Sequence, residues 1–349
     1  MTSENDPDTK PQRRVRYSGK NPVKFSEKYK EHNPDLYSDD IEKVKQRGAT
    51  PVGTHRPICV DEILKILDPK PSETALDATL GYGGHTSHIL PKLLPDGRLI
   101  GLDQDPIERP KTEARLRKLG FDEKSLLIGA INFKDAKKFL NENNIPKVDL
   151  ILADLGISSM QIDHPGRGFS YKTNAPLDLR MNPSLGISAA ELIQKISVNE
   201  LAELLHYNSD ELRAEVIARA LILKKPKTSL ELVDTVREVI SGFSAKVKEA
   251  EGDAPIRRTF QALRIAVNDE FKVLDQFLND IPDILNHGGR VAILSFHSGE
   301  DRRVKKSFQA GQRSGQYSQA SSDFIRPSAE EQRSNSRSKS AKLRWAIKK

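Results

Sequence analysis

The sequence predicts an α/β protein with a doubly wound, mostly parallel sheet and a helical insertion after the fourth strand. Short apolar runs alternate with amphipathic stretches over residues 58–154, as in strand–helix–strand units. A glycine-rich turn, Gly81-Tyr-Gly-Gly84, follows the first of these strands. Residues 162–255 then show consecutive helical patterns with little strand signal, before an apolar run returns at residues 290–296.

The glycine turn predicts a site for a nucleoside-bearing cofactor. It joins a short strand, residues 74–80, to a helix that begins at His85. Glycine lets the backbone turn tightly and approach a ligand closely. The next strand ends in Asp103, 22 residues after Gly81, a distance that suits a carboxylate bound to a ribose diol.

Two residues favour S-adenosylmethionine as that cofactor. Thr86 stands where a dinucleotide-binding turn has its third glycine. Asp77 comes late in the first strand, where its carboxylate would repel a pyrophosphate but could receive an ammonium group. S-adenosylmethionine carries an ammonium group and no phosphate. A dinucleotide and a ligand-free structural turn remain alternatives.

The next elements lead to two further candidate residues. We expect helices at 58–67, 106–119 and 135–140 and strands at 125–128 and 148–154, with Pro110 marking a late helix start or a kink. Phe133 follows the third strand and could stack on an adenine or pack in the core. Asp154 closes the nearly uniformly apolar fourth strand, where cofactor and substrate would meet.

The insertion is expected to be built from capped helices. Ser188, Ser197 and Thr228 each precede a glutamate by three residues, which is the capping-box pattern. A helix from Thr259 is expected to return to the sheet, and a fifth strand over 290–296 leads to the edge of the crevice.

That fifth strand is followed by His297, Glu300 and Asp301. Their spacing matches no standard metal-ligand pattern, so we predict a hydrogen-bonded wall and no metal. The role of His297 stays open.

Composition limits the remaining possibilities. The 349 residues carry a net charge of +7 and a single cysteine, Cys59, which excludes an internal disulfide and a zinc cluster of cysteines. No membrane span, signal peptide or transit peptide is recognisable, and a cytoplasmic enzyme is the simplest interpretation.

Charge and composition also suggest the domain boundaries. Residues 302–349 hold 13 Lys and Arg against 3 Asp and Glu. We therefore predict a basic C-terminal tail at 311–349 for an anionic partner, with a merely solubilising tail as the alternative. A polar N-terminal extension is expected at 1–53, the cofactor domain at 54–161 and 256–310, and the substrate-recognition insertion at 162–255.

Together these residues resemble the ribosomal RNA small subunit methyltransferase H family of S-adenosylmethionine-dependent cytosine-N4 methyltransferases. The matching stretches are His55-Arg-Pro57, Val60-Asp-Glu62, Asp77–His85, Gly101–Pro106, Asp154–Gln161, Arg167–Ser170, Pro176–Met181, Thr259–Ile265, Ser295–Ser298 and Ser340–Arg344. They extend over residues 55–344 and include both the expected sheet and the insertion. Coincidence does not explain so wide a spread.

The resemblance implies a Rossmann-like methyltransferase that methylates a cytosine in the decoding region of small-subunit (16S) rRNA. It implies that the insertion recognises RNA. The cofactor contacts carried over are Gly83, Gly84, His85, Asp103, Phe133, Asp154 and Gln161. Free rRNA and the assembled small subunit are alternative substrates, and the oligomeric state is open, with a homodimer as one alternative.

The sequence departs from related patterns at informative places. Amino methyltransferases often have Asp-Pro-Pro-aromatic after the fourth strand, whereas Leu155-Gly156 follows Asp154 here and no stacking aromatic comes next. Asp154 is therefore either a catalytic acceptor or only a cofactor contact. Gly299 replaces the leucine usual after the His-Ser pair. A DNA or small-molecule amino methyltransferase and a non-catalytic rRNA-binding assembly factor are the competing functions.

Overall fold

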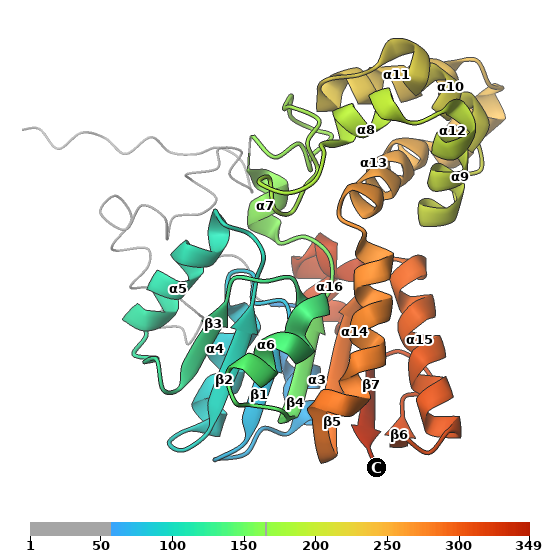
Figure 1. Ribbon diagram of the computed structural model, residues 1–349. Helices are drawn as coiled ribbons and strands as arrows, with labels where there is room; N and C mark the ends of the chain where they lie inside the picture. The colour runs from blue at the N-terminus through green and yellow to red at the C-terminus, as the bar shows by residue number, and fades with distance from the viewer. Residues whose placement is uncertain (1–56, 165) are drawn as a thin grey trace, which may run out of the picture. The chain divides into compact units, whose positions relative to one another are not determined.

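Seven strands form one sheet in the order β3-β2-β1-β4-β5-β7-β6 (Figure 1). The computed structural model describes residues 57–164 and 166–349. The strands are β1 (Thr74–Asp77), β2 (Arg98–Leu102), β3 (Leu126–Gly129), β4 (Val148–Asp154), β5 (Leu285–Ser295), β6 (Tyr317–Ala320) and β7 (Lys342–Lys348). β1 to β5 run parallel, and β7 is antiparallel to β5 and β6. The doubly wound, mostly parallel sheet is confirmed.

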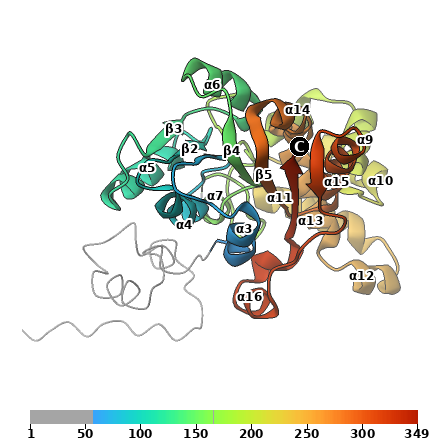
Figure 2. The ribbon, with the colours of Figure 1, turned by 90° about the horizontal axis from the view of Figure 1, so that it is seen from below.

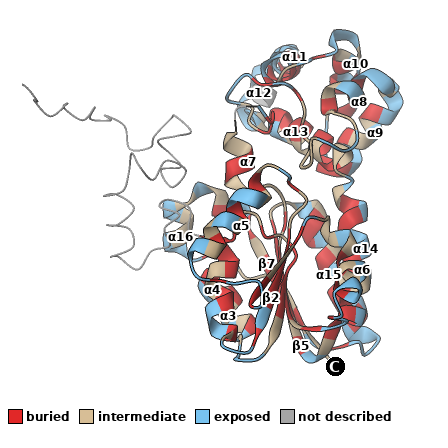
Figure 3. Cartoon of the chain, turned by 60° about the vertical axis from the view of Figure 1, so that its left-hand side comes forward, coloured by how far each residue is buried: buried red, intermediate tan, exposed pale blue. Residues whose placement is uncertain are grey.

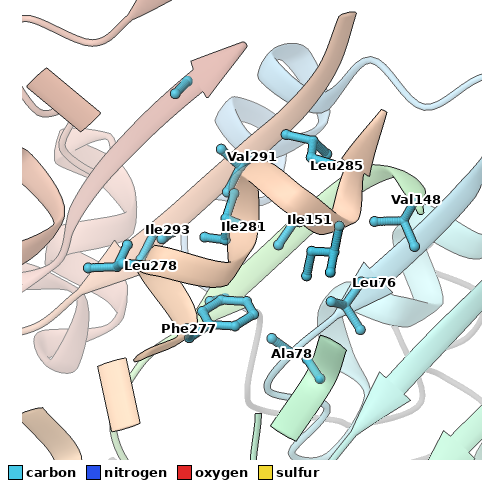
Figure 4. Packing of buried hydrophobic residues seen from close by; sticks show 14 of the residues in the cluster. Leu76, Ala78, Val148, Ile151, Phe277, Leu278, Ile281, Leu285, Val291 and Ile293 are labelled. Carbon is cyan, nitrogen blue, oxygen red and sulfur yellow. The ribbon is translucent and has the colours of Figure 1, made fainter. Parts of the chain in front are cut away.

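Helices cover both faces of the sheet (Figures 2 and 3), so its central strands are mostly apolar. In β4, Leu150 and Leu152 belong to one buried cluster, whereas Ile151 and Ala153 belong to the opposite one. The first face is covered by α3 (Val60–Leu67), α4 (Gly84–Leu93) and α5 (Glu108–Lys118), the second by α6 (Ala136–Glu142), α14 (Glu270–Ile284) and α15 (Ser298–Arg313). Phe277 of α14 packs in the second cluster (Figure 4).

The insertion has its own hydrophobic core. Its helices are α8 (Ala189–Lys195), α9 (Val198–Ser209), α10 (Ala214–Lys224), α11 (Ser229–Ser241), α12 (Ala245–Glu251) and α13 (Ala254–Val267), preceded by α7 (Ser159–Asp163). Ser188 and Ser197 form complete capping boxes, as predicted. Thr228 forms only half of a capping box at α11. Its side chain accepts from the Glu231 backbone N–H, but the Glu231 carboxylate accepts from the backbone N–H of Lys227 and not from that of Thr228.

The helix expected to return from Thr259 to the sheet is two helices. Phe260 and Leu263 of α13 are buried in the insertion core, and only α14 packs on the sheet. The helical run is interrupted at Asp269, which has a left-handed backbone (φ 50°) and lies between the end of α13 and the start of α14. The insertion therefore extends beyond the predicted boundary at residue 255.

The predicted C-terminal tail is also wrong, because residues 311–349 complete the sheet. β6 and β7 enclose a segment with α16 (Ala329–Ser334) and the 3-10 helix η3 (Ser336–Ser340). Leu343 and Ala346 of β7 are fully buried. Arg344 is buried too, and its Nε donates to Asp301 Oδ1 at 2.6 Å. Charge alone misidentified this segment, since three of its cations lie within a strand whose Leu343 and Ala346 are buried.

Two further expectations concern the helices and the chain's start. α5 begins at Glu108, which places Pro110 in the first turn, so the late start is confirmed. The predicted polar extension 1–53 lies outside the described residues. Among residues 57–349 that the structure describes, no helix is long and apolar enough to cross a membrane.

We predict that β7 is essential to the stability of the fold. Leu343→Ala should lower the free energy of unfolding by about 2–5 kcal/mol, because it empties a fully buried position. Lys339→Ala, at an exposed position just before the strand, should change it by less than about 0.5 kcal/mol. Urea unfolding measures both. Equal stability of the two variants would show that this strand contributes nothing to the cooperative unit.

Candidate active site

Two aspartates close neighbouring strands at the point where the sheet reverses its strand order. Asp77 ends β1 and Asp154 ends β4, and the two strands pair in parallel with Asp77 opposite Leu152. β2 continues the sheet on one side of β1, and β5 continues it beyond β4. Ligands bind outside the carboxyl ends of strands at such a switch point. Both aspartates therefore lie at the expected crevice.

The glycine turn above β1 is fixed by close packing. Gly81 and Gly83 have positive φ values of 50° and 75°. A Cβ on Gly84 would lie 2.6 Å from Pro57 and from the Tyr82 ring. Gly84 thus serves the contact of α4 with its neighbours, whereas its predicted contact with a cofactor stays a prediction, as does that of Gly83.

Thr86, at the place of the absent third glycine, holds Asp77. Its hydroxyl donates to Asp77 Oδ2 at 2.7 Å, and the Thr79 backbone N–H donates to Oδ1 at 3.1 Å. Burial raises the pKa of Asp77, against the opposing effect of the Thr86 hydrogen bond. A cationic ligand group would favour the ionised form of this carboxyl.

Asp103 lies directly after β2 and beside the glycine turn. Its Oδ1 accepts from the Asp105 backbone N–H at 2.8 Å. Burial, together with the nearby charges of Asp105 and Asp77, raises the pKa of Asp103 to about 7, although backbone N–H groups of Asp105 and Gly81 oppose the rise. The structure thus places this carboxyl at the turn, and its contact with a ribose stays a prediction.

His85 and Asp154 face each other at the carboxyl ends of the strands. His85 Nε2 lies 3.4 Å from Asp154 Oδ2. Asp154 Oδ1 and His85 Nε2 are buried and form no hydrogen bond within the described residues. The Asp154 backbone N–H donates to the Thr79 hydroxyl at 2.6 Å, which fixes the end of β4 against the turn after β1. An open acceptor therefore remains at the strand end.

Gln161 has a structural role that the sequence also encodes. With Ser158 it forms a capping box at the start of α7, a Ser-x-x-Gln pattern that we did not single out. Its Oε1 accepts from the Ser158 backbone at 2.9 Å, and its Nε2 donates to Asp105 Oδ2 at 2.7 Å. Both ends of the amide are thus engaged within the protein. The predicted cofactor contact of Gln161 stays a prediction.

Phe133 packs at the margin of the core, which is one of the two alternatives that the sequence leaves open. It begins the 3-10 helix η2 (Phe133–Asp135) and packs edge-on against Phe277, with ring centroids 5.2 Å apart. It is only partly buried at the margin of the core. One part of the ring thus belongs to the core, while stacking on an adenine stays a prediction.

A possible metal group does come together within the described residues, at the starts of α14 and α15. Potential ligand atoms of Glu270, His297 and Glu300 lie within 4.8 Å of one another. Arg264 donates to both oxygens of Glu270, at 2.8 and 2.9 Å, and Glu300 accepts from the Phe296 backbone at 2.8 Å. Helix N-termini also favour carboxylates over cations. The acids are satisfied without an ion, and the expected lack of a metal stays a prediction.

Asp301 does not belong to the group of Glu270, His297 and Glu300, although the sequence predicts it in one hydrogen-bonded wall with His297 and Glu300. Its carboxylate pairs with Arg344 and, at 3.2 Å, with Lys342, both on β7. A second group contains Cys59, Glu62 and Glu331. Burial raises the pKa of the Cys59 thiol, which keeps it protonated, whereas metals bind the thiolate.

Comparison with known proteins identifies the family. The sequence profile of the MraW methylase family matches residues 53–349. The chain is 52% identical over 341 residues to "Ribosomal RNA small subunit methyltransferase H 1" of Lachnoclostridium phytofermentans, covering 96% of this chain and 93% of the relative. It is 50% identical over 344 residues to "Ribosomal RNA small subunit methyltransferase H 2" of Alkaliphilus metalliredigens, covering 97% and 98%. The chain belongs to the MraW methylase family, together with the proteins named ribosomal RNA small subunit methyltransferase H.

Proposed function

We propose that this protein transfers a methyl group from S-adenosylmethionine to the exocyclic N4 of a cytosine in the decoding region of small-subunit (16S) rRNA. The observation that carries the proposal is the unpaired, buried Oδ1 of Asp154 at the switch point of a methylase sheet. It offers an acceptor where methyl donor and target amine would meet. The names of the curated relatives support rRNA as the substrate.

The chemistry requires help because the N4 lone pair is delocalised into the ring. S-adenosylmethionine, when bound, would supply its methyl carbon to N4 and leave as the thioether, while N4 would become positively charged and then lose a proton. Asp154 Oδ1 accepts an amino hydrogen and stabilises that charge. His85, 3.4 Å from the other oxygen, stands where the released proton can be taken up. Asp103 holds the ribose and Asp77 the ammonium end of the cofactor.

Leu155 and Gly156 give this strand end a different geometry from Asp-Pro-Pro-aromatic. Leu155 is buried in the core, and Gly156 has a left-handed backbone with φ 94°. Phe296, at the end of β5, lies 4.0 Å from where a Cβ on Gly156 would be. A ring from the neighbouring strand can therefore supply the stacking surface that the sequence after Asp154 lacks.

Labelled S-adenosylmethionine tests the proposal. The protein is incubated with small ribosomal subunits, and separately with free rRNA, from cells that lack the enzyme, and the labelled base is mapped. N4-methylcytosine in the decoding region is expected. Label on another RNA base, on DNA or on a small amine would support the competing methyltransferases, and RNA binding without label would support an assembly factor.

Asp103 should make cofactor binding depend on pH. With a pKa of about 7, it is protonated below that pH and loses its charge-assisted hydrogen bonds to the ribose, so the affinity should rise between pH 6 and 8. Asp103→Ala should weaken binding about ten- to a hundredfold at pH 8, since such bonds are worth roughly 1.5–3 kcal/mol. Calorimetry across this range should show a flatter profile for the variant. Identical profiles would refute the ribose contact.

Asp154→Asn should separate chemistry from binding. The substitution preserves size but removes the charge and one acceptor, so kcat should fall more than about tenfold while cofactor affinity changes little. Asp149→Asn is the matched control, because Asp149 lies near the other end of β4 and bonds to Thr74 and Asn286. Single-turnover methylation at saturating cofactor is measured. Full-rate transfer by the Asp154 variant would reduce this residue to a cofactor contact.

The cations before β7 should contact RNA phosphates. β7 runs antiparallel to β5 and starts opposite Ser295, so the segment before it lies at the crevice end of the sheet. Replacing the exposed Arg326, Arg333 and Lys339 by alanine should reduce the slope of log K against log salt by about 2, at roughly 0.7 per phosphate of single-stranded RNA. The exposed Lys118, Lys124 and Lys138 serve as the control triple. An unchanged slope in the first triple would move the RNA contacts to other cations.

A further inference from the structure

We propose that Arg167 is a positioning residue that couples cofactor binding to RNA binding. It stands in the segment 163–182, which leads from the sheet into the insertion. The inference rests on the proposed function for the identity of the RNA. It is carried by a chain of hydrogen bonds that runs from the cofactor-side acid Asp103 to the junction of α13 and α14.

The first link is the buried pair of Arg167 and Asp105. Arg167 Nη1 donates to Asp105 Oδ2 at 2.9 Å, and the two side chains are 5% and 0% exposed. The same oxygen accepts from Gln161, and Oδ1 accepts from the Ile107 backbone at 2.8 Å. The Asp105 backbone in turn donates to Asp103 Oδ1. Arg167 is therefore two hydrogen bonds from the predicted ribose acid.

The second link joins Arg167 to the far end of its own segment. Its Nη2 donates to the carbonyls of Arg180 and Met181, at 3.0 and 2.7 Å. One planar guanidinium thus holds Asp105 and this stretch together, a geometry that lysine cannot reproduce. Because the group is buried, each lost contact would leave a polar atom without water.

The stretch held by Arg167 is strained and is fixed from a second side. Leu179 has a left-handed backbone with φ 64°, which costs a non-glycine residue free energy and persists only where the surroundings enforce it. Asn268, at the end of α13, donates to the Leu179 carbonyl at 2.7 Å and accepts from the Met181 backbone at 2.7 Å. The α13–α14 junction is therefore fixed to this stretch.

The same stretch reaches the cofactor side of the sheet directly. Gln104 Nε2 lies 3.4 Å from Met181 Sδ, and Gln104 Oε1 accepts from Asn132 at 3.0 Å. Gln104 follows Asp103 in the chain, and Asn132 precedes Phe133. Residues 179–181 thus contact the loop predicted to hold the ribose, and Gln104 links that loop to the one predicted to hold the adenine. A cofactor that orders these loops would also order the entrance to the insertion, and RNA on the insertion would do the reverse.

Equilibrium binding of S-adenosylhomocysteine, with and without saturating small subunits, measures the coupling. For the wild type, RNA should tighten this binding by a factor in the range of about 5 to 150. Arg167→Lys should bring the factor to within about twofold of 1, because it keeps the charge but loses the fork. Asn268→Ala removes the other anchor without touching an ion pair and should reduce the factor too.

Arg258→Lys is the matched control. Arg258 donates to the buried Glu211 at 2.7 Å inside the insertion, away from the cofactor loops, so its variant should keep the wild-type factor. A folded Arg167→Lys protein in which RNA tightens S-adenosylhomocysteine binding as much as in the wild type overturns the inference. So does a wild type that methylates rRNA but whose S-adenosylhomocysteine affinity does not change with RNA. A wild type that binds S-adenosylhomocysteine but neither binds nor methylates rRNA overturns the proposed function itself, and the inference with it.

Discussion

A single buried carboxylate, Asp105, organises the cofactor side of this protein. Its oxygens accept from the backbone at the start of α5, from Gln161 and from Arg167, while its backbone N–H orients Asp103. A fully buried charge is stable only when it is paired and hydrogen-bonded. Three parts of the fold supply the donors to this carboxylate. They are the start of α5, the capping box of α7 and the entrance to the insertion.

The carboxyls near this residue suit the cationic cofactor that we propose for the strand ends. Burial raises the pKa of Asp77 and of Asp103; the charge of Asp154 adds to the rise at Asp77, and those of Asp105 and Asp77 add to the rise at Asp103. A ligand with a sulfonium and an ammonium group relieves that repulsion, whereas a pyrophosphate would increase it. The same reasoning explains why Thr86 takes the place of a third glycine, since its hydroxyl holds Asp77 in position.

The sheet was predictable wherever the signal is local, in apolar runs followed by glycine turns and terminal aspartates. β7 escaped prediction because its cations dominate the composition, although Arg344 is buried against Asp301, 43 residues away. The break between α13 and α14 rests on a left-handed Asp269, for which neither glycine nor proline gives a signal. The sequence does not mark Arg167 as an anchor, because its partner Asp105 lies 62 residues earlier in the chain. Contacts of this kind depend on the fold and cannot be predicted from spacing.

The central claim is that cofactor and target base meet at the ends of β1 and β4. The most direct measurement is a crystal structure of the protein with S-adenosylhomocysteine and a cytidine-containing oligonucleotide of the decoding region. The account predicts the ribose diol on Asp103 and the cytosine N4 within hydrogen-bond distance of Asp154 Oδ1. A cytosine bound away from Asp154, with its N4 directed at other groups, would contradict it.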